Sequence, residues 1–136
     1  MTKFESEIKT IPANIERIYA TLSDLNNLER IAGNLPQDKI KDLTYDTDSC
    51  SFSVQPIGAV SFRIVDREEN KTIKFGTEKS PVDCFFWIQL LPNGEQESRM
   101  KLTVKAELNP FIKGMVSKPL QEGLNKLADV LAAITY

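Results

Sequence analysis

The 136-residue sequence contains no histidine. Histidine is the commonest general acid or base in enzymes and the commonest zinc ligand, so its absence excludes histidine-activated nucleophiles and ordinary zinc sites. The six glycines stand singly, and neither the dinucleotide-binding nor the P-loop fingerprint is present. We therefore predict no catalytic residue, no cofactor and no metal ion from the sequence.

Cysteine and long apolar runs are also scarce. Cys50 and Cys84 have no metal-binding or redox spacing and fall in hydrophobic runs, which predicts reduced, buried thiols. No apolar run is long enough for a transmembrane helix, and residues 3–9 alternate instead of forming a signal-peptide core. We expect a cytoplasmic protein.

The 17 basic and 19 acidic residues are interspersed, which predicts neither a nucleic-acid partner nor a membrane-binding patch.

The hydrophobic periodicity predicts a strand, two short helices, six strands and a long helix. The chain length suggests one domain, residues 1–136. Helical spacing follows Pro12 over about ten residues, and Ser23-Asp24 can cap a second short helix that ends between Gly33 and Pro36. The later strands are expected over residues 40–47, 49–55, 59–67, 72–79, 82–91 and 97–108, separated by short turns that imply an antiparallel meander.

The last stretch predicts one amphipathic helix. Asn109 suits its N-cap and Pro110 its first position. Two glycines and Pro119 in its interior cost roughly 5 kcal/mol, which packing against a surface must supply. Its apolar stripe consists of Ile112, Val116, Leu120, Leu124, Leu127, Leu131 and Ile134.

The widths of the predicted sheet and helix constrain the fold. Seven strands span roughly 30 Å, whereas a helix is about 10 Å across. One helix cannot cover a flat sheet of that width, so the sheet must curl around it. The sequence therefore predicts an α+β fold with a concave space between sheet and helix.

Residues 11–24, Ile-Pro-Ala-Asn-Ile-Glu-Arg-Ile-Tyr-Ala-Thr-Leu-Ser-Asp, resemble the opening of the START-like, polyketide cyclase and birch-pollen-allergen superfamily (SRPBCC). The order of elements is similar over the whole chain. The resemblance implies a helix-grip fold: a curved seven-stranded antiparallel sheet, its first strand beside its last, wrapped on the C-terminal helix around a hydrophobic cavity. It implies no universal catalytic residues.

Alternation along the strands predicts which side chains face the cavity. Phe4, Ser6 and Ile8 are expected to point inward on the first strand. A two-residue Asn93-Gly94 turn would place Trp87 opposite Met100, whereas a loop longer by one residue would reverse the faces. The predicted cavity residues are Phe52, Phe62, Phe75, Phe85, Trp87, Met100, Leu102, Phe111, Met115, Pro119 and Leu120.

Three further features carry alternatives. An apolar row remains on the outer face of strand 82–91, which predicts a partner surface for a homodimer unless other structure covers it. Pro119 and Gly114 suggest either a gate over the cavity or an ordinary bend of the helix. The strand residues Tyr45, Arg63, Glu78 and Asp83 either reach the cavity, where a carboxylate can act as a base, or lie in solvent.

The leading functional hypothesis is non-catalytic binding of a small hydrophobic ligand, such as a lipid, polyketide or isoprenoid-like molecule, between the sheet and the C-terminal helix. One alternative is a metal-independent cyclase or dehydratase that acts on a hydrophobic substrate. The other is a protein-interaction module associated with a chaperone or a ribosome. The resemblance indicates the fold and does not choose among these functions.

Overall fold

The computed structural model describes residues 1–34, 40–54, 58–80 and 82–136. Some predicted features lie outside the described residues: the end of the second short helix at Pro36, the end of strand 49–55 at Gln55, and the turn residues Pro56, Ile57 and Pro81. The elements are β1 (Thr2–Glu5), β2 (Lys9–Ile11), α1 (Ile15–Leu22), the 3-10 helices η1 (Leu25–Arg30) and η2 (Ala32–Asn34), β3 (Ile40–Tyr45), β4 (Ser49–Val54), β5 (Gly58–Glu68), β6 (Thr72–Lys79), β7 (Cys84–Pro92), β8 (Ser98–Ala106) and α2 (Pro110–Ala133).

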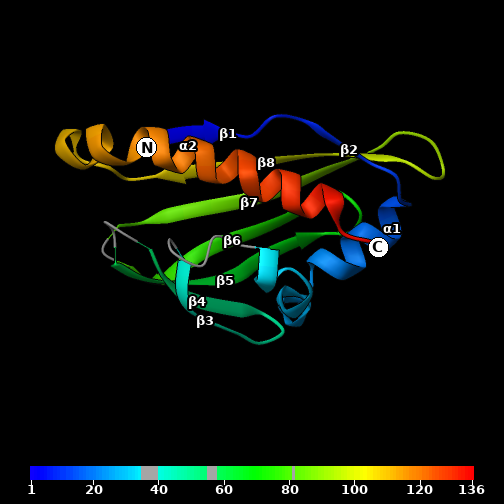
Figure 1. The fold of residues 1–136 in the computed structure, drawn as a ribbon, viewed down its shortest axis with the longest axis horizontal. Coiled ribbons are helices and arrows are strands. Elements are labelled where there is room, and N and C mark those ends of the chain that lie inside the picture. Colours follow the sequence, from blue (N-terminus) through cyan, green and yellow to red (C-terminus); the bar gives the residue numbers. More distant parts are fainter. Residues whose placement is uncertain (35–39, 55–57, 81) are drawn as a thin grey trace.

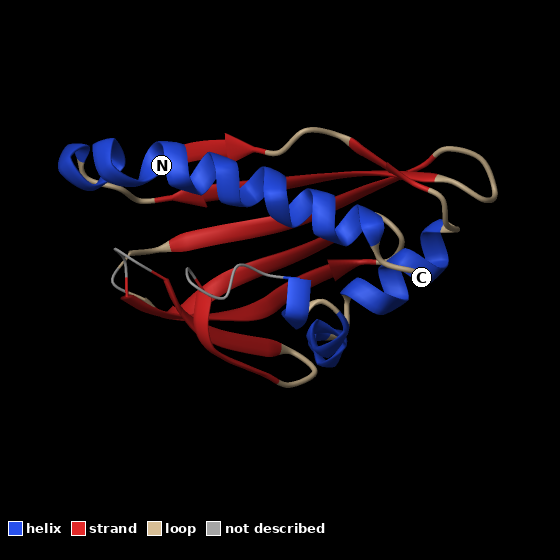
Figure 2. Ribbon diagram, viewed as in Figure 1, coloured by secondary structure: helices blue, strands red, loops and turns tan. Residues whose placement is uncertain are grey.

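The strands form one antiparallel sheet in the order β1-β8-β7-β6-β5-β4-β3, with β2 also paired to β8. The sheet curls on one side of α2, and α1 and η1 close one end (Figures 1 and 2). The predicted α+β helix-grip architecture is confirmed, with the first strand beside the last. Eight strands replace the expected seven because the first one is split.

None of the described helices is long and apolar enough to cross a membrane. The cytoplasmic location inferred from the sequence stays a prediction.

An extra residue between β1 and β2 interrupts the first strand. Phe4 pairs with Val104 and Lys9 pairs with Met100. The five-residue step from Phe4 to Lys9 therefore matches a four-residue step on β8. Such an insertion exchanges the faces of the side chains that follow it. Phe4 and Ile11 are buried, whereas Ile8 is 65% exposed. The prediction that Ile8 points inward is therefore wrong, because simple alternation does not continue through the interruption.

The core lies between the inner face of the sheet and α2. Aligned rows of apolar side chains cross this face from strand to strand; one row runs Phe4, Val104, Phe86, Phe75 and Ile64. Helix α2 contributes Val116, Leu124, Ala128 and Leu131, all buried. The capping of α2 by Asn109, whose side chain accepts from the Ile112 amide at 2.9 Å, is confirmed, as is most of the predicted apolar stripe. Ile134, the last residue of that stripe, is instead the extended C-cap, because the helix ends at Ala133.

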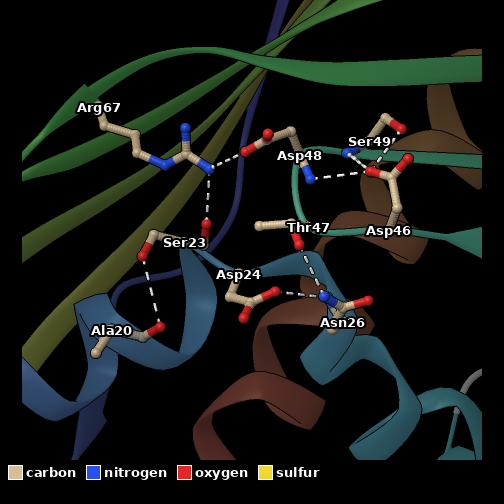
Figure 3. Close-up of polar contacts among 9 residues, drawn as sticks. All are labelled: Ala20, Ser23, Asp24, Asn26, Asp46, Thr47, Asp48, Ser49 and Arg67. Atoms are coloured by element: carbon tan, nitrogen blue, oxygen red, sulfur yellow. Dashed lines mark hydrogen bonds and ion pairs between the residues drawn. The ribbon is translucent and has the colours of Figure 1, made fainter.

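A polar network fixes the short helices to the sheet (Figure 3). Arg67 on β5 donates to the Ser23 carbonyl at 2.9 Å and pairs with Asp48 at 2.6 Å. The Asn26 side chain donates to the Thr47 hydroxyl at 2.9 Å. These contacts hold the junction of α1 and η1 against the hairpin of β3 and β4, which explains why the helices stay at the end of the sheet.

A polar seam attaches α2 to the edge of the sheet that β1 and β2 form. The helix contributes side chains at intervals of four residues, and the strands contribute groups at intervals of two. Gln121 donates to the Glu5 carbonyl at 2.7 Å, Asn125 accepts from the Glu7 amide at 3.0 Å, and Asp129 pairs with Lys9 at 2.5 Å. The seam places α2 over this edge, and its closest backbone approaches to the sheet are to β1, β2 and β8.

Replacement of Ser6 by alanine tests the geometry of the interruption. The buried Ser6 hydroxyl accepts from the Leu102 amide at 2.9 Å, so Ser6→Ala leaves a buried amide without this partner. We expect the free energy of unfolding to fall by about 1–3 kcal/mol in urea denaturation. The control Ser53→Ala should change it by less than about 0.5 kcal/mol. Equal effects of the two substitutions would contradict this register.

Candidate ligand-binding surface

Five of the predicted cavity residues lie on the inner face of the sheet. Phe75, Met100 and Leu102 are buried in the core. Phe52 and Phe62 are half-buried on the neighbouring strands β4 and β5, with ring centroids 6.1 Å apart and nearly parallel planes. These two rings form an aromatic platform, which we call the Phe52–Phe62 pair.

Phe85 and Trp87 lie on the outer face. Trp87 pairs with Thr103 and Phe85 with Lys105, so the predicted pairing of Trp87 with Met100 is wrong. The paired strands end at Pro92 and Ser98, and a five-residue loop replaces the expected two-residue turn, with the Asn93 amide bonded to the Glu97 carbonyl at 3.0 Å. The loop is longer by an odd number of residues, so the faces are exchanged. Phe86, Ile88 and Leu90 face the core instead.

The outer aromatic row is partly covered by lysine side chains. The Lys74 ammonium lies 4.8 Å from the Phe85 ring centroid and 5.5 Å from that of Trp87. The Lys105 ammonium lies 5.7 Å from the Trp87 ring on its other flank. The exposed side chains of Val65 and Leu91 lie on the same face. Lysines with aromatics therefore replace the purely apolar row that the sequence suggested.

The predicted contributions of α2 divide between its two sides. Phe111 is 77% exposed and Met115 is 48% exposed, and Pro119 is also exposed. These three side chains are not brought to the inner face of the sheet. Leu120 is half-buried and packs against the core. The helix continues through Pro119, and the gate hypothesis stays a prediction.

The inner face is wider than the part that α2 covers. The helix backbone lies closest to β1, β2 and β8, whereas the Phe52–Phe62 pair lies across the sheet on β4 and β5. In Figure 1 these strands lie below α2 in the view, with β7 and β6 between. An apolar aromatic surface that the packing of α2 leaves half-buried is suited to hold the apolar part of a small molecule.

Few ionisable groups reach the inner face among the described residues. Tyr45 is half-buried opposite Cys50 on this face. The side chains of Arg63 and Glu78 form an ion pair with each other and are exposed, as is Asp83, in agreement with the solvated alternative. The described residues contain no cluster of three potential metal ligands and no buried side-chain polar atom without a hydrogen bond.

The two cysteines are unreactive in character. Burial raises the pKa of the Cys50 thiol to about 11, with a smaller contribution from the Asp46 carboxylate. Burial also raises the pKa of the Cys84 thiol to about 11. Both are free thiols, as predicted, and both are mostly protonated at neutral pH.

A second feature, a groove of about 710 Å³, lies at the C-terminal end of α2 beside η1. No sequence pattern indicates this groove, because Arg30 lies far along the chain from its other lining residues, which fall within residues 126–135 and have no motif spacing. They are Arg30, Lys126, Asp129, Val130, Ala133, Ile134 and Thr135. The groove therefore combines apolar side chains with two cations.

Comparison with known proteins relates the chain to solved structures. No protein-family model and no curated protein sequence matches it. Norcoclaurine synthase from Thalictrum flavum is similar with a TM-score of 0.72 and 14% identity, over 96% of this chain and 84% of that one. A START superfamily protein from Mycobacterium smegmatis has a TM-score of 0.65 and 15% identity, over 96% and 94% of the two chains.

A protein from Thermus thermophilus is similar at a TM-score of 0.68 and 19% identity, over 96% of this chain and 94% of that one. At these identities the likeness establishes the fold. The chain has the helix-grip fold of START-like proteins and norcoclaurine synthase, which confirms at the level of the fold the resemblance predicted from residues 11–24 and the order of elements.

Proposed function

We propose that this protein binds a small hydrophobic ligand between α2 and the inner face of β4, β5 and β6. The observation that carries this proposal is the Phe52–Phe62 pair, two aromatic side chains on the inner face that remain half-buried. Leu120 on α2 and Phe75 on β6 supply further apolar surface. A lipid, a polyketide or an isoprenoid-like molecule has the apolar surface that such a site would bury.

The energetics of apolar burial support this function. Each square ångström of apolar surface removed from water contributes about 25 cal/mol. A ligand that covers the remaining exposed parts of two phenylalanine rings, roughly 100 Å², thus gains about 2.5 kcal/mol from them without any ionic contact. Tyr45, on the same face opposite Cys50, supplies one polar group that can orient the ligand.

A structural neighbour supports the choice of a small ligand. One structure of norcoclaurine synthase from Thalictrum flavum, similar over 96% of this chain, is a complex with dopamine and hydroxybenzaldehyde. In that protein the same fold accommodates small aromatic molecules. We extend the binding of small molecules, and no catalytic step, to the present chain.

Substitution of one aromatic residue on each face tests the site. N-phenyl-1-naphthylamine, an uncharged fluorescent probe, should bind the wild-type protein, and Phe62→Ala should weaken its affinity about tenfold, because some 50 Å² of apolar contact is lost. The control Trp87→Ala, on the outer face, should leave the affinity within about twofold. The proposal would be overturned if N-phenyl-1-naphthylamine did not bind, or if its affinity fell in Trp87→Ala and not in Phe62→Ala.

Thiol alkylation supplies an independent readout, because Cys50 pairs with Phe62 on the inner face. With the pKa of both thiols near 11 instead of 9.0, iodoacetamide at pH 8.5 should react with the folded protein about 100-fold more slowly than with the urea-unfolded chain. Bound N-phenyl-1-naphthylamine should slow the reaction of Cys50 further. Peptide mass spectrometry distinguishes the two cysteines, and faster reaction of Cys50 with the probe bound would count against this location.

We also propose that the outer row of Phe85, Trp87, Val65 and Leu91 is the contact of a homodimer. Val65 is 55% exposed and Leu91 is 61% exposed, so both add accessible apolar surface to the face that carries the two aromatic rings. Size-exclusion chromatography with light scattering at high micromolar concentration should give about twice the 15.3 kDa chain mass. Phe85→Lys with Trp87→Lys should give the monomer, whereas Ile8→Lys should not. A monomeric wild-type protein would exclude the dimer.

A further inference from the structure

The groove beside η1 has the composition of a site for an amphipathic molecule. Val130 and Ala133 on the last turn of α2, with the C-cap residue Ile134, give it an apolar wall. Arg30 from η1 and Lys126 from α2 bring two cationic groups to the same depression. Its volume of about 710 Å³ lies within the range of ordinary ligand sites.

The positive charge of this groove is not balanced within the described part of the chain. Asp129, its only acidic lining residue, is already paired with Lys9 at 2.5 Å. Arg30 donates to the Thr135 carbonyl at 3.3 Å, which leaves most of its five N–H donors for another acceptor. Among the described residues neither Arg30 nor Lys126 has a carboxylate partner. The C-terminal end of α2 opposes these two charges with only about half a negative charge.

The apolar wall connects the groove to the core. Val130 and Ile134 line the groove and also pack against the buried cluster that contains Leu131 and Ala128. Tyr136 packs against the same cluster, and its hydroxyl donates to the Leu131 carbonyl. A molecule in the groove would therefore have its charged contacts at the surface and its hydrocarbon part against apolar side chains that are continuous with the core.

We propose that Arg30 and Lys126 bind the carboxylate of an amphipathic ligand whose hydrocarbon part passes along Val130 and Ile134 to the inner face of the sheet. This inference rests on the proposed function and adds the chemical class of the ligand, a hydrocarbon monocarboxylate. An arginine offers a planar fork of donors to a carboxylate, and a lysine adds a mobile point charge. An uncharged molecule with the same hydrocarbon chain would bind without these contacts.

Two ligands with the same chain separate the contribution of the carboxylate from that of the hydrocarbon. Dodecanoate and dodecanol would each displace N-phenyl-1-naphthylamine at pH 7.5 and low salt, below the concentration at which either aggregates. The wild-type protein should bind dodecanoate about tenfold more tightly than dodecanol. Arg30→Gln with Lys126→Gln should remove this preference and leave dodecanol affinity within about twofold, and 0.5 M NaCl should reduce the preference in the wild type.

Lys118→Gln is the matched control, because Lys118 is an exposed lysine of α2 that does not line the groove. It should leave the preference unchanged. Lys126→Gln alone should lower the affinity for dodecanoate about threefold. This single variant keeps the hydrogen bond from Arg30 to the Thr135 carbonyl, so its effect cannot come from loss of that bond. Thermal melts report whether every variant is folded. Equal affinity of the wild type for both ligands, or an equal loss of both in the double variant, would overturn the carboxylate assignment while hydrophobic binding stands. Failure of both ligands and of the probe to bind would overturn the proposed function as well.

Discussion

The polar seam between α2 and the first strands determines where the helix lies. Four helical residues advance about 6.0 Å and two strand residues about 6.6 Å, so side chains every four residues on α2 meet every second residue of the strand. This match aligns Gln121, Asn125 and Asp129 with Glu5, Glu7 and Lys9. The helix consequently lies over one edge of the sheet, farther from the inner face of β4 and β5 than from that of β8.

The extra residue between β1 and β2 makes the last contact of this seam possible. It turns Lys9 towards α2, where Asp129 lies, and turns Ile8 towards solvent. The Asp129 carboxylate raises the pKa of Lys9, so the ammonium stays charged across the physiological range. The same pairing occupies the acidic residue of the groove, so Arg30 and Lys126 have no carboxylate partner among the described residues. One local irregularity thus affects both the position of the helix and the electrostatics of the groove.

Much of the fold follows from the sequence because periodicity and turn chemistry are local properties. The bounds of β3 to β8 and the cap of α2 agree with the predicted segments to within a few residues. The faces of β7 could not be predicted, because both of its sides are apolar and the length of the loop after Pro92 alone decides between them. Asn93-Gly94 suggested a short turn, whereas the bond from the Asn93 amide to the Glu97 carbonyl closes a longer loop.

The site was predictable only where alternation was unambiguous. Phe52, Phe62 and Phe75 were placed correctly on the inner face, since each lies in a strand with one apolar side. The groove was not predictable, because Arg30 and Lys126 are separated by most of the chain and each alone resembles an ordinary surface cation. Polar residues at four-residue spacing on α2 likewise resembled a solvated face, although they form the seam.

We propose that the ligand lies on the half-buried Phe52–Phe62 pair, across the sheet from the strands that α2 approaches most closely. Intermolecular nuclear Overhauser effects between bound N-phenyl-1-naphthylamine and assigned aromatic protons test it most directly, because they report only protons within about 5 Å and the two faces of the sheet carry different aromatic residues. We predict cross-peaks from the probe to the rings of Phe52 and Phe62. Cross-peaks to Phe85 and Trp87, with none to Phe52 and Phe62, would contradict it.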